Sequence, residues 1–293
     1  MSLQDALARA ISQATGEVFK PENRRAVSGG SINTTEVLEG RGRKFFVKLN
    51  TAARLDMFEA EAEGLAEIAN SESVRVPQPV CCGTHADQAY QVLEYLDIGR
   101  GHSKTDELLG QQLAAMHRAT RTRFGWRRAN TIGSTPQINT EADDWPAFYR
   151  EQRLRFQLEL AATNGHGDNL WRRGERLLEK IPAFFAGYQP LPSLLHGDLW
   201  GGNHAALNDG TPVIFDPAVY FGDREADLAM TELFGGFGED FYAAYRAAWS
   251  LDSGYRVRRD LYNLYHVLNH LNLFGGGYRA QAEQVIERLL SEA

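Results

Sequence analysis

The residues best suited to chemistry lie in residues 196–203 (His-Gly-Asp-Leu-Trp-Gly-Gly-Asn), followed by residues 213–216 (Val-Ile-Phe-Asp). An aspartate with an asparagine five positions later, and a second aspartate after an apolar run, is the arrangement used in phosphoryl transfer from ATP. In that chemistry the first aspartate orients and deprotonates the acceptor hydroxyl, while the other two side chains hold Mg²⁺ through oxygen atoms. The spacing therefore predicts Asp198 as the catalytic base and Asn203 and Asp216 as metal ligands.

Three features of this run need separate interpretations. A lone His-Gly-Asp is also found in turns closed by an Asx hydrogen bond, but the correctly spaced Asn203 and Asp216 argue against that alternative. His196 is expected to pack and hydrogen-bond beneath the loop rather than to transfer protons. Trp200 lies in a glycine-flanked loop, where its ring could stack on the apolar face of a sugar substrate. Packing of Trp200 in the core is an equally open alternative.

A glycine-rich segment, residues 28–33 (Ser-Gly-Gly-Ser-Ile-Asn), is the candidate phosphate loop. Glycine lets the backbone approach the β- and γ-phosphates without a Cβ atom in the way. The segment is not a G-x-G-x-x-G motif, and a plain hairpin turn is the alternative. Its place between the first two predicted strands favours the phosphate loop, with Gly29, Gly30, Ser31 and Asn33 as nucleotide-binding residues.

A lysine on an apolar strand is the next candidate. Lys48 closes the run Phe-Phe-Val-Lys over residues 45–48, and an ammonium group inside such a strand needs an anionic partner. Glu61, on the helix predicted next along the chain, can supply it and so form the pair that orients ATP in protein kinases. The alternative is an edge-strand lysine beside a solvated helix, because that helix carries several further glutamates.

The elements that would hold these residues begin with a β-rich region. Hydrophobic periodicity predicts a helix, three strands, a second helix and two more strands, over residues 3–14, 26–27, 34–39, 44–49, 54–69, 80–82 and 90–96. This order, β-β-β-α-β-β after the first helix, is that of the small lobe of a kinase-like fold.

After Asp97 the pattern becomes mostly helical. Helices are expected over residues 105–120, 141–162, 168–187, 225–235, 238–249, 256–272 and 276–292. The exception is a hairpin around residues 205–216, turned by Asn-Asp-Gly. We therefore predict an α+β, bilobal, protein-kinase-like fold. It has a five-stranded antiparallel nucleotide-binding lobe with one main helix (residues 1–97) and a larger, mostly helical catalytic and substrate-binding lobe (residues 98–293).

The segment after Asp216 limits the kind of acceptor. A protein kinase has a long activation segment here, ending in Ala-Pro-Glu, that presents a peptide. This chain enters its next predicted helix almost at once, so the acceptor is expected to be a small molecule. The charged residues at the start of that helix are expected to form ion pairs and caps near the loop; they are Asp223, Arg224, Glu225 and Asp227.

Composition describes an ordinary globular chain and restricts its partners. Hydrophobic residues make up 43% and charged residues 24%, and the formal net charge of −7 argues against broad nucleic-acid binding. The two cysteines, Cys81 and Cys82, are neighbours on a predicted strand, so they point to opposite faces and fit a reducing interior. No secretory signal is apparent, and no segment approaches the ~20 apolar residues of a membrane helix. A cytoplasmic location is expected.

The remaining histidines and aromatic residues suggest packing. His266 and His270 are four apart and could chelate a metal ion, but ordinary packing is favoured, and no zinc motif is present. Aromatic residues at helical spacing near the C-terminal end of the chain are expected in the core; they are Phe234, Phe237, Phe241, Tyr242, Tyr245 and Trp249.

Together these motifs resemble the fructosamine kinase (ketosamine-3-kinase) family, within the aminoglycoside-phosphotransferase-like small-molecule kinases. Many antibiotic, choline and homoserine kinases share the His-Gly-Asp loop alone. More specific are the Trp200-containing loop, the run Asp-Pro-Ala-Val-Tyr-Phe-Gly-Asp-Arg-Glu at 216–225 and Leu-Phe-Gly-Gly-Phe at 233–237. Further resembling segments lie at residues 29–33, 46–48, 57–61, 109–117 and 148–154.

The resemblance implies ATP- and Mg²⁺-dependent phosphorylation of the 3-hydroxyl of a ketosamine, a fructosamine or ribulosamine left when a sugar glycates an amine. The 3-phosphate makes the adduct labile, so the reaction would be a deglycation repair. The resemblance also implies that Glu94, Tyr95 and Leu96 form the hinge that meets adenine through its backbone. Glycated proteins would be a further class of acceptor, and the expected state is a monomer or weak dimer that binds neither nucleic acid nor membrane.

Two alternatives stay open at this point. One is a kinase for another small hydroxylated substrate, such as an aminoglycoside, choline or homoserine. The other is a non-catalytic nucleotide-binding module. The sequence argues against the second, because degenerate kinases usually lose at least one of the residues corresponding to Lys48, Asp198, Asn203 and Asp216, and all four are present here.

Overall fold

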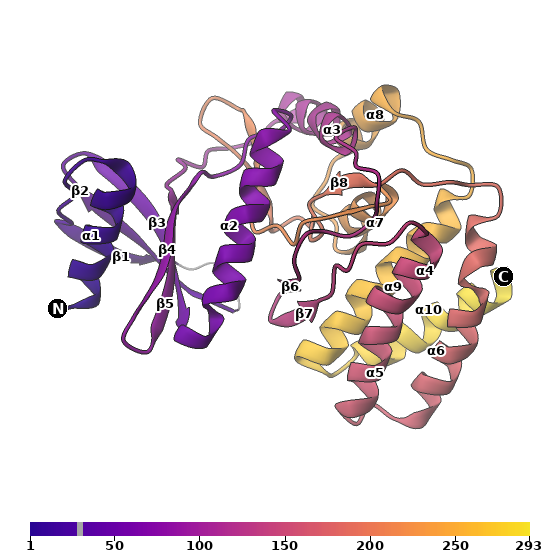
Figure 1. The fold of residues 1–293 in the computed structure, drawn as a ribbon. Helices are drawn as coiled ribbons and strands as arrows, with labels where there is room; N and C mark the ends of the chain where they lie inside the picture. The colour runs from indigo at the N-terminus through magenta and orange to yellow at the C-terminus, as the bar shows by residue number, and fades with distance from the viewer. Residues whose placement is uncertain (28–31) are drawn as a thin grey trace.

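The computed structural model describes residues 1–27 and 32–293, which form a β-rich part and a helical part on either side of helix α2 (Figure 1). The two chain termini lie at opposite ends of the molecule (Figure 1). The elements of the first part are α1 (Leu3–Thr15), β1 (Asn23–Val27), β2 (Thr34–Gly40), β3 (Arg43–Thr51), a 3-10 turn (Ala52–Arg54), α2 (Leu55–Asn70), β4 (Pro79–His85) and β5 (Gln88–Glu94).

Within the described residues, the N-terminal strands form one five-stranded antiparallel sheet in the order β1-β2-β3-β5-β4. Strand β3 is central, and its register places Lys48 opposite Thr35 of β2 and Gln91 of β5. Alternate residues of a strand face opposite sides of a sheet. Val47 therefore packs into the small core beneath α1, whereas Lys48 points to the side covered by α2.

Helix α2 belongs to both parts of the molecule. Met57 and Phe58, in its first turn, pack against Ala89 of the sheet. Leu65 and Ile68, further along the helix, are fully buried in the main core of the helical part. A shift of α2 would therefore move both the partner of Lys48 and the packing of the helical part. The division into lobes at residues 97 and 98 falls between β5 and α3 and stays a prediction.

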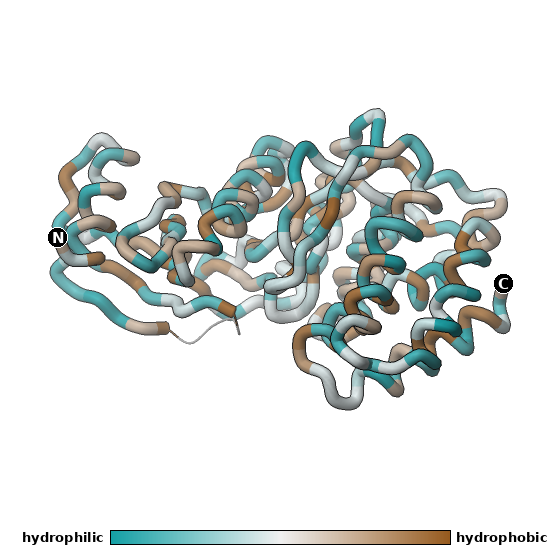
Figure 2. Tube along the Cα trace, turned by 60° about the horizontal axis from the view of Figure 1, so that its bottom comes forward, coloured by the Kyte–Doolittle hydropathy of each residue, from teal (hydrophilic) through white to brown (hydrophobic). Residues whose placement is uncertain are grey.

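The helical part surrounds a large apolar core, and along its helices hydrophobic residues alternate with hydrophilic ones (Figure 2). This alternation is the pattern of helices with one buried face. The helices are α3 (Ser103–His117), α4 (Trp145–Tyr149), α5 (Phe156–Thr163), α6 (Asp168–Lys180), α7 (Glu225–Leu233), α8 (Glu239–Ala248), α9 (Tyr255–Phe274) and α10 (Tyr278–Glu292). The fold is α+β with a kinase-like arrangement, as predicted.

Some boundaries differ from the predicted ones, for local reasons. The helix expected over residues 141–162 begins only at Trp145, because Asp144 caps it by accepting a hydrogen bond from the Ala147 amide at 2.9 Å. It then continues through a π-helical segment, Arg150–Arg155, into α5. The helix expected over 168–187 ends at Lys180 and continues as a 3-10 turn, Ile181–Phe185. The strand expected to reach residue 96 ends at Glu94.

Three short hairpin-like pairs lie in the helical part, and only one of them was predicted. Strands β9 (His204–Ala206) and β10 (Pro212–Ile214) form the predicted hairpin. The pair of β6 (Asn130–Ile132) with β7 (Thr135–Gln137), and that of β8 (Ser193–Leu195) with β11 (Tyr220–Gly222), were not predicted. These strands have three residues each, which is too short to produce a period-2 pattern.

Candidate active site

Lys48 lies at the centre of an ion cluster between the sheet and the helical part. Its Nζ atom is 2.7 Å from Oε1 of Glu61 and 2.6 Å from Oδ1 of Asp216. The side chains of Lys48 and Glu61 are only 4% and 12% exposed, whereas that of Asp216 is 42% exposed. The fold therefore brings together a strand, a helix and a loop that are distant in the sequence, and it leaves the Asp216 carboxylate open on one side.

The protonation state of Lys48 follows from this pairing. Burial opposes the positive charge, but the charges of Asp216 and Glu61 and their hydrogen bonds more than offset it, so the pKa of Lys48 is raised. The ammonium group is therefore a permanent cation. It occupies the position where a kinase lysine meets nucleotide phosphates.

The catalytic run forms a tight loop in which Asp198 and Asn203 touch. The Asn203 side-chain amide donates hydrogen bonds to the Asp198 carbonyl at 2.8 Å and to Oδ2 of Asp198 at 3.2 Å. The loop is closed by the Asn203 backbone amide, which donates to the Trp200 carbonyl at 2.9 Å. The predicted spacing of five residues thus corresponds to one compact turn that orients the Asp198 carboxylate.

Asp198 is held in an environment that disfavours its charge. Burial, and then the nearby negative charge of Asp216, raise the pKa of Asp198 to about 7, against the opposing effect of the Asn203 hydrogen bond. A carboxyl group with a pKa near neutrality is a better proton acceptor than an ordinary aspartate, because the ideal general base titrates near the working pH.

Gly197 allows the catalytic loop to lie directly against the segment that follows Asp216. Its φ angle is +82°, and a Cβ atom there would lie 2.1 Å from the Ala218 carbonyl oxygen. The two segments are joined by the Ala218 amide, which donates to the His196 carbonyl at 2.8 Å. The buried His196 ring bonds through Nε2 to the Phe215 carbonyl at 2.9 Å. His196 therefore packs and bonds beneath the loop.

Asp227, on α7, fixes the backbone of the catalytic loop. Its carboxylate accepts hydrogen bonds from the His196 amide at 2.7 Å and from the Gly197 amide at 2.8 Å. Burial alone would raise its pKa, but hydrogen bonds from His117 and the Gly197 amide outweigh burial, so the pKa of Asp227 is lowered. Asp227 is thus a permanent anion that positions the residues preceding Asp198.

A chain of buried side chains supports Asp227 from the other side. His117 of α3 is fully buried, and burial lowers its pKa. The neutral ring donates from Nε2 to Asp227 at 3.2 Å and accepts at Nδ1 from the Tyr245 hydroxyl at 2.8 Å. Arg224 donates to the same hydroxyl at 3.1 Å. Among the charged residues at the start of α7, Asp227 and Arg224 are thus structural, as expected.

The other two charged residues of that group are structural as well. Asp223 accepts a hydrogen bond from the Tyr262 hydroxyl at 2.6 Å, and its Oδ1 accepts from the Glu225 amide at 3.0 Å. Glu225 forms a buried ion pair with Arg258 of α9, with an Nε–Oε2 distance of 2.7 Å. These pairs attach the start of α7 to α9.

The donor atoms around Asp216 suit a magnesium ion. Asp216 adopts a positive φ of 57°, a region that aspartate enters more readily than most residues. The Phe215 amide donates to the Asn203 carbonyl at 3.0 Å, so the two predicted ligands lie on adjoining segments. Because the Asn203 NH₂ group is directed at Asp198, its amide oxygen is directed away from Asp198 and is free to act as a hard oxygen ligand.

The protein supplies only part of a coordination sphere. In residues 1–27 and 32–293, no group of three or more His, Cys, Asp and Glu side chains is placed to hold a metal ion. One carboxylate and one amide oxygen match the way Mg²⁺ binds in kinases, where nucleotide phosphates and water complete the shell. The residues present therefore fit a metal that arrives with a nucleotide. His266 and His270 pack instead, and Nδ1 of His270 bonds the His266 carbonyl at 2.8 Å.

The predicted hinge directly follows the central sheet. Glu94 ends β5 and is paired with Arg75, and its Oε2 accepts a hydrogen bond from the Gln78 amide at 3.1 Å. The Tyr95 ring lies under Lys44, whose Nζ atom is 5.3 Å from the ring centroid. Leu96 is half-buried. The Glu94 side chain is thus engaged by Arg75 and Gln78, and the role of these three residues as a hinge stays a prediction.

The predicted phosphate loop is only partly within the described residues. Gly29, Gly30 and Ser31 lie outside them. Asn33 directly precedes β2, and its Oδ1 atom accepts a hydrogen bond from the Asn50 side chain at 2.8 Å. Asn50 also donates to the Ile32 carbonyl at 3.2 Å, which anchors the end of the loop to β3, two residues beyond Lys48.

Trp200 is not a core residue. Its side chain is 40% exposed and meets the Phe234 ring edge to face, with 6.4 Å between the ring centroids. Phe234 is also 40% exposed, so the expectation that this aromatic residue lies in the core is wrong. The reason is that α7 ends at Leu233, which places Phe234 beyond the helical stripe that packs inward. Phe241 and Tyr245 are buried, as expected.

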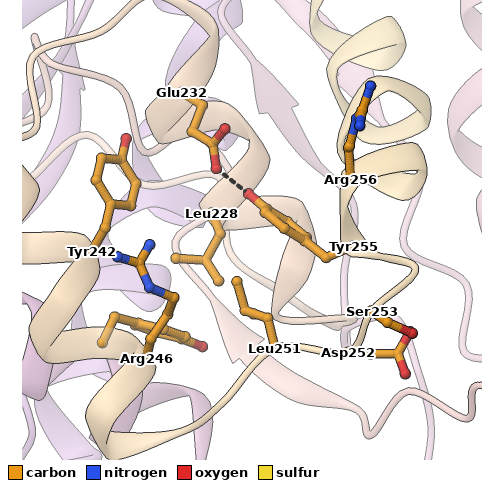
Figure 3. A pocket seen from close by; sticks show the side chains of 10 residues that line it. Leu228, Glu232, Tyr242, Arg246, Leu251, Asp252, Ser253, Tyr255 and Arg256 are labelled. Carbon is orange, nitrogen blue, oxygen red and sulfur yellow. Dashed lines mark hydrogen bonds between the residues drawn. The ribbon is translucent and has the colours of Figure 1, made fainter.

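A cavity of about 280 Å³ lies in the helical part, lined by side chains of α7, α8 and α9 (Figure 3). Leu228 and Leu251 point into it, and Glu232 accepts a hydrogen bond from the Tyr255 hydroxyl at 2.6 Å across one side (Figure 3). Lys48, Asp198 and Asp216 are not among its lining residues. The cavity is therefore separate from the candidate active site.

Buried amide side chains that were not predicted from the sequence hold the segment after Asp216. The Asn130 side chain donates to the Val219 carbonyl at 2.8 Å, and the Gln137 side chain donates to the Ala218 carbonyl at 3.0 Å. Gln137 accepts in turn from the Tyr265 hydroxyl at 2.8 Å. Asp227 was seen as a structural residue, but its contact with the catalytic loop was not predicted. Nothing in the sequence marked Asn130, whose neighbours are Ala129 and Thr131.

The fold and the site together define a phosphotransferase of the kinase-like class. The sheet presents a lysine paired with a helix glutamate, and the helical part presents a loop aspartate, an asparagine and a second aspartate. Solved structures agree on the fold: an ADP-bound aminoglycoside phosphotransferase, APH(2'')-Ib, is 15% identical with a TM-score of 0.62, covering 96% of each chain.

The chain belongs to the fructosamine kinase family, whose model it matches over residues 3–292. It is 48% identical over 285 residues to a probable ketoamine kinase of Synechocystis sp., covering 97% of this chain and 96% of the relative. It is 43% identical to the chloroplastic protein-ribulosamine 3-kinase of Arabidopsis thaliana, covering 90% of this chain and 82% of that one. The crystal structure of a candidate fructosamine-3-kinase from Thermobifida fusca is 32% identical, with a TM-score of 0.86 and 99% of both chains covered.

Proposed function

We propose that the protein transfers the γ-phosphoryl group of ATP to the 3-hydroxyl group of a ketosamine, a fructosamine or ribulosamine. The observation that carries this proposal is the convergence of Lys48, Asp198 and Asp216 on one site within a member of the fructosamine kinase family. The relatives named ketoamine kinase and protein-ribulosamine 3-kinase support the choice of acceptor.

The nucleotide would bind between the sheet and the helical part. Lys48 would meet its phosphates, held in place by Glu61. The backbone of Glu94, Tyr95 and Leu96 would meet adenine, and the segment of Gly29, Gly30, Ser31 and Asn33 would cover the phosphates. Asn203 and Asp216 would hold Mg²⁺, which when bound neutralises charge that develops on the phosphates.

Asp198 would accept the proton of the attacking hydroxyl group. In phosphoryl transfer the transition state is loose, so the main contribution of this residue is to hold the hydroxyl oxygen in line with the γ-phosphorus. The Asn203 hydrogen bond fixes one carboxylate oxygen and leaves the other for the acceptor. The exposed Trp200 ring, two residues further on, would lie against the apolar face of the sugar.

The product explains why such a reaction would serve repair. Phosphate on C3 is a better leaving group than hydroxide, so the phosphorylated adduct decomposes and releases the amine. Free small adducts and glycated proteins are both acceptors under this proposal, and we expect a monomer or weak dimer.

Both cysteines are free thiols in the part of the chain that the structure describes, which supports a cytoplasmic setting. None of the helices in residues 1–27 and 32–293 has the length and apolar character needed to cross a bilayer.

The test is a comparison of acceptors with purified protein, Mg²⁺ and ATP, following ADP release. A ribulosamine or fructosamine should raise ADP release above the background hydrolysis, and phosphorus NMR of the product should locate the phosphate on C3. Asp198→Ala should abolish this increase in ADP release, and its thermal unfolding should still be that of a folded protein. If an aminoglycoside, choline or homoserine is phosphorylated and the ketosamines are not, the acceptor is wrong. If ATP raises the melting temperature but no acceptor is phosphorylated, the catalytic proposal is wrong.

A further inference from the structure

A row of aromatic rings extends from the catalytic loop across the helical part. The Trp200 ring meets Phe234 with a centroid distance of 6.4 Å. Phe234 lies 4.9 Å from His270, and His270 lies 5.5 Å from Phe274, again between centroids. We call these four residues the ring row. They come from the catalytic loop, from the end of α7 and from the last turns of α9, so tertiary folding and not local sequence assembles them.

The ring row is exposed to a degree that core packing does not explain. Trp200 and Phe234 are each 40% exposed, and Phe274 is 55% exposed. Leu191, which is 56% exposed, is an apolar side chain outside the ring row. Contiguous apolar surface on a soluble protein is a common mark of a binding site.

The ring row begins at the loop that carries Asp198, the proposed catalytic base. The Gly201 backbone lies so close to the segment after Phe234 that a Cβ atom on Gly201 would be 2.8 Å from the Gly235 carbonyl oxygen. The His204 side chain, at the end of the catalytic loop, bonds the Gly236 carbonyl at 3.2 Å. Phe234 is therefore attached to the loop that carries Asp198.

The far end of the ring row lies beside the nucleotide-binding lobe. Leu273, next to Phe274 on α9, approaches the tip of the β6–β7 hairpin, where a Cβ atom on Gly133 would be 3.0 Å from Leu273 Cδ1. The same Cβ atom would be 3.3 Å from Cδ1 of Ile32, the residue that follows the glycine-rich segment. The end of α9 that carries Phe274 thus lies near Ile32 of the β-rich part.

Resting on the function proposed above, we propose that the ring row beyond Trp200 binds the amine half of the ketosamine and makes the enzyme prefer adducts whose amine carries an apolar or aromatic chain. The amine nitrogen is bonded to C1, two carbons from the oxygen that is phosphorylated. With the 3-hydroxyl at Asp198, the nitrogen and its substituent leave the sugar close to the catalytic loop. The ring row is the surface that begins there.

The chemistry of the ring row matches such a substituent. The secondary amine of a ketosamine is protonated at neutral pH, and ring faces attract a cation through their quadrupole. The chain beyond the nitrogen would cover Phe234 and Phe274 and remove their apolar surface from water. His270 presents a neutral ring, because burial lowers its pKa and its Nδ1–H donates to the His266 carbonyl at 2.8 Å. No second cation in the ring row therefore repels the amine.

The test uses two ribulose adducts that differ only in the amine, one made from methylamine and one from benzylamine. The wild-type protein should show a higher kcat/KM for the benzylamine adduct. Phe234→Ala and Phe274→Ala should each lower kcat/KM for that adduct by about fivefold, through KM, and change the methylamine adduct by less than about twofold. Phe234→Leu keeps apolar surface but has no ring, so its kcat/KM for the benzylamine adduct should lie between the values of the wild type and of Phe234→Ala. Leu191→Ala serves as the matched control for loss of an exposed apolar side chain and should change neither substrate.

The outcomes separate this proposal from the function on which it rests. If the wild-type protein phosphorylates neither adduct, the proposed function fails. If it phosphorylates both, but the Phe234 and Phe274 variants lose activity on both adducts equally or on neither, the ring row does not bind the amine and this proposal is overturned. Both side chains are exposed, so thermal unfolding of the variants should match that of the wild type.

Discussion

Replacing Asp198 with asparagine should abolish phosphoryl transfer and yet stabilise the nucleotide-free protein at alkaline pH. The pKa of Asp198 is raised from its ordinary value of 3.8 to about 7, chiefly by burial and then by Asp216. A carboxyl group whose pKa is higher in the folded than in the unfolded chain binds its proton more tightly when folded. Folding stability therefore falls as the pH rises from about 4 to about 7, where this contribution is fully lost. Asparagine stays neutral throughout and avoids this loss.

The size of the effect can be derived from the pKa. A rise from 3.8 to about 7 corresponds to ~4 kcal/mol at roughly 1.36 kcal/mol per pKa unit. Asp198 is partly open to solvent, which screens its charge, so we expect about 1–2 kcal/mol. For a chain of this size that is a rise in Tm of about 2–4 °C. The Asn203 hydrogen bond survives the substitution, because the side-chain oxygen of asparagine also accepts.

The assay is thermal and urea unfolding of wild-type and Asp198→Asn protein at pH 5, 6, 7 and 8, without nucleotide and with a chelator present. The stability difference should grow from pH 5 to pH 7 and then level off. Asp87→Asn, at an exposed turn between β4 and β5, controls for the loss of one negative charge and should show no such growth. A difference that is constant with pH, or an asparagine variant that becomes less stable as the pH rises, would refute the assignment of a raised pKa to Asp198.

Three further predictions concern the groups around Asp198. Asp216→Asn removes the second cause of the raised pKa, so NMR titration of the Asp198 carboxyl carbon should give a lower pKa; an unchanged value contradicts their coupling. Asp227→Ala removes the acceptor of the Gly197 amide and leaves buried donors unpaired. It should lower kcat about 100-fold or more while nucleotide affinity, measured by calorimetry, stays within a few-fold; equal losses in both would indicate general unfolding. Lys48→Met leaves two carboxylates without their cation and should lower unfolding stability by about 3 kcal/mol in urea, together with loss of ATP binding; unaltered stability would contradict the buried ion cluster.

The parts of the fold that follow from local pattern could be predicted from the sequence. Helix α2 and strands β2 and β3 have clear periodicity, and the structure places them close to the expected boundaries. The pairing of Lys48 with Glu61 was expected because a buried ammonium group requires an anion, and because the downstream catalytic loop favoured the kinase pair over a solvated helix glutamate. The spacing of Asp198 and Asn203 predicted their roles, but the hydrogen bond between them was not predicted.

The parts that depend on tertiary contact could not be predicted. The β6–β7 hairpin has no pattern of its own, and its role appears only when Asn130 and Gln137 reach the carbonyls of Val219 and Ala218. The exposure of Phe234 depends on where α7 ends, and helix ends are the least certain feature of a sequence pattern. The contact of His117 with Asp227 joins residues 110 positions apart, for which spacing gives no signal.

One physical reason separates the residues that could be predicted from the sequence from those that could not. A kinase site needs a carboxylate that is destabilised enough to accept a proton and a lysine that stays charged while buried, and both states are unfavourable in isolation. The surrounding fold must offset them with paired polar groups that do no chemistry themselves. Asp227 supplies such pairing for the loop amides, and Glu61 supplies it for Lys48. The reacting residues must be recognisable in sequence because their chemistry fixes their type and spacing. The supporting residues need only reach the right atom, which many positions can satisfy, and so the structure is required to find them.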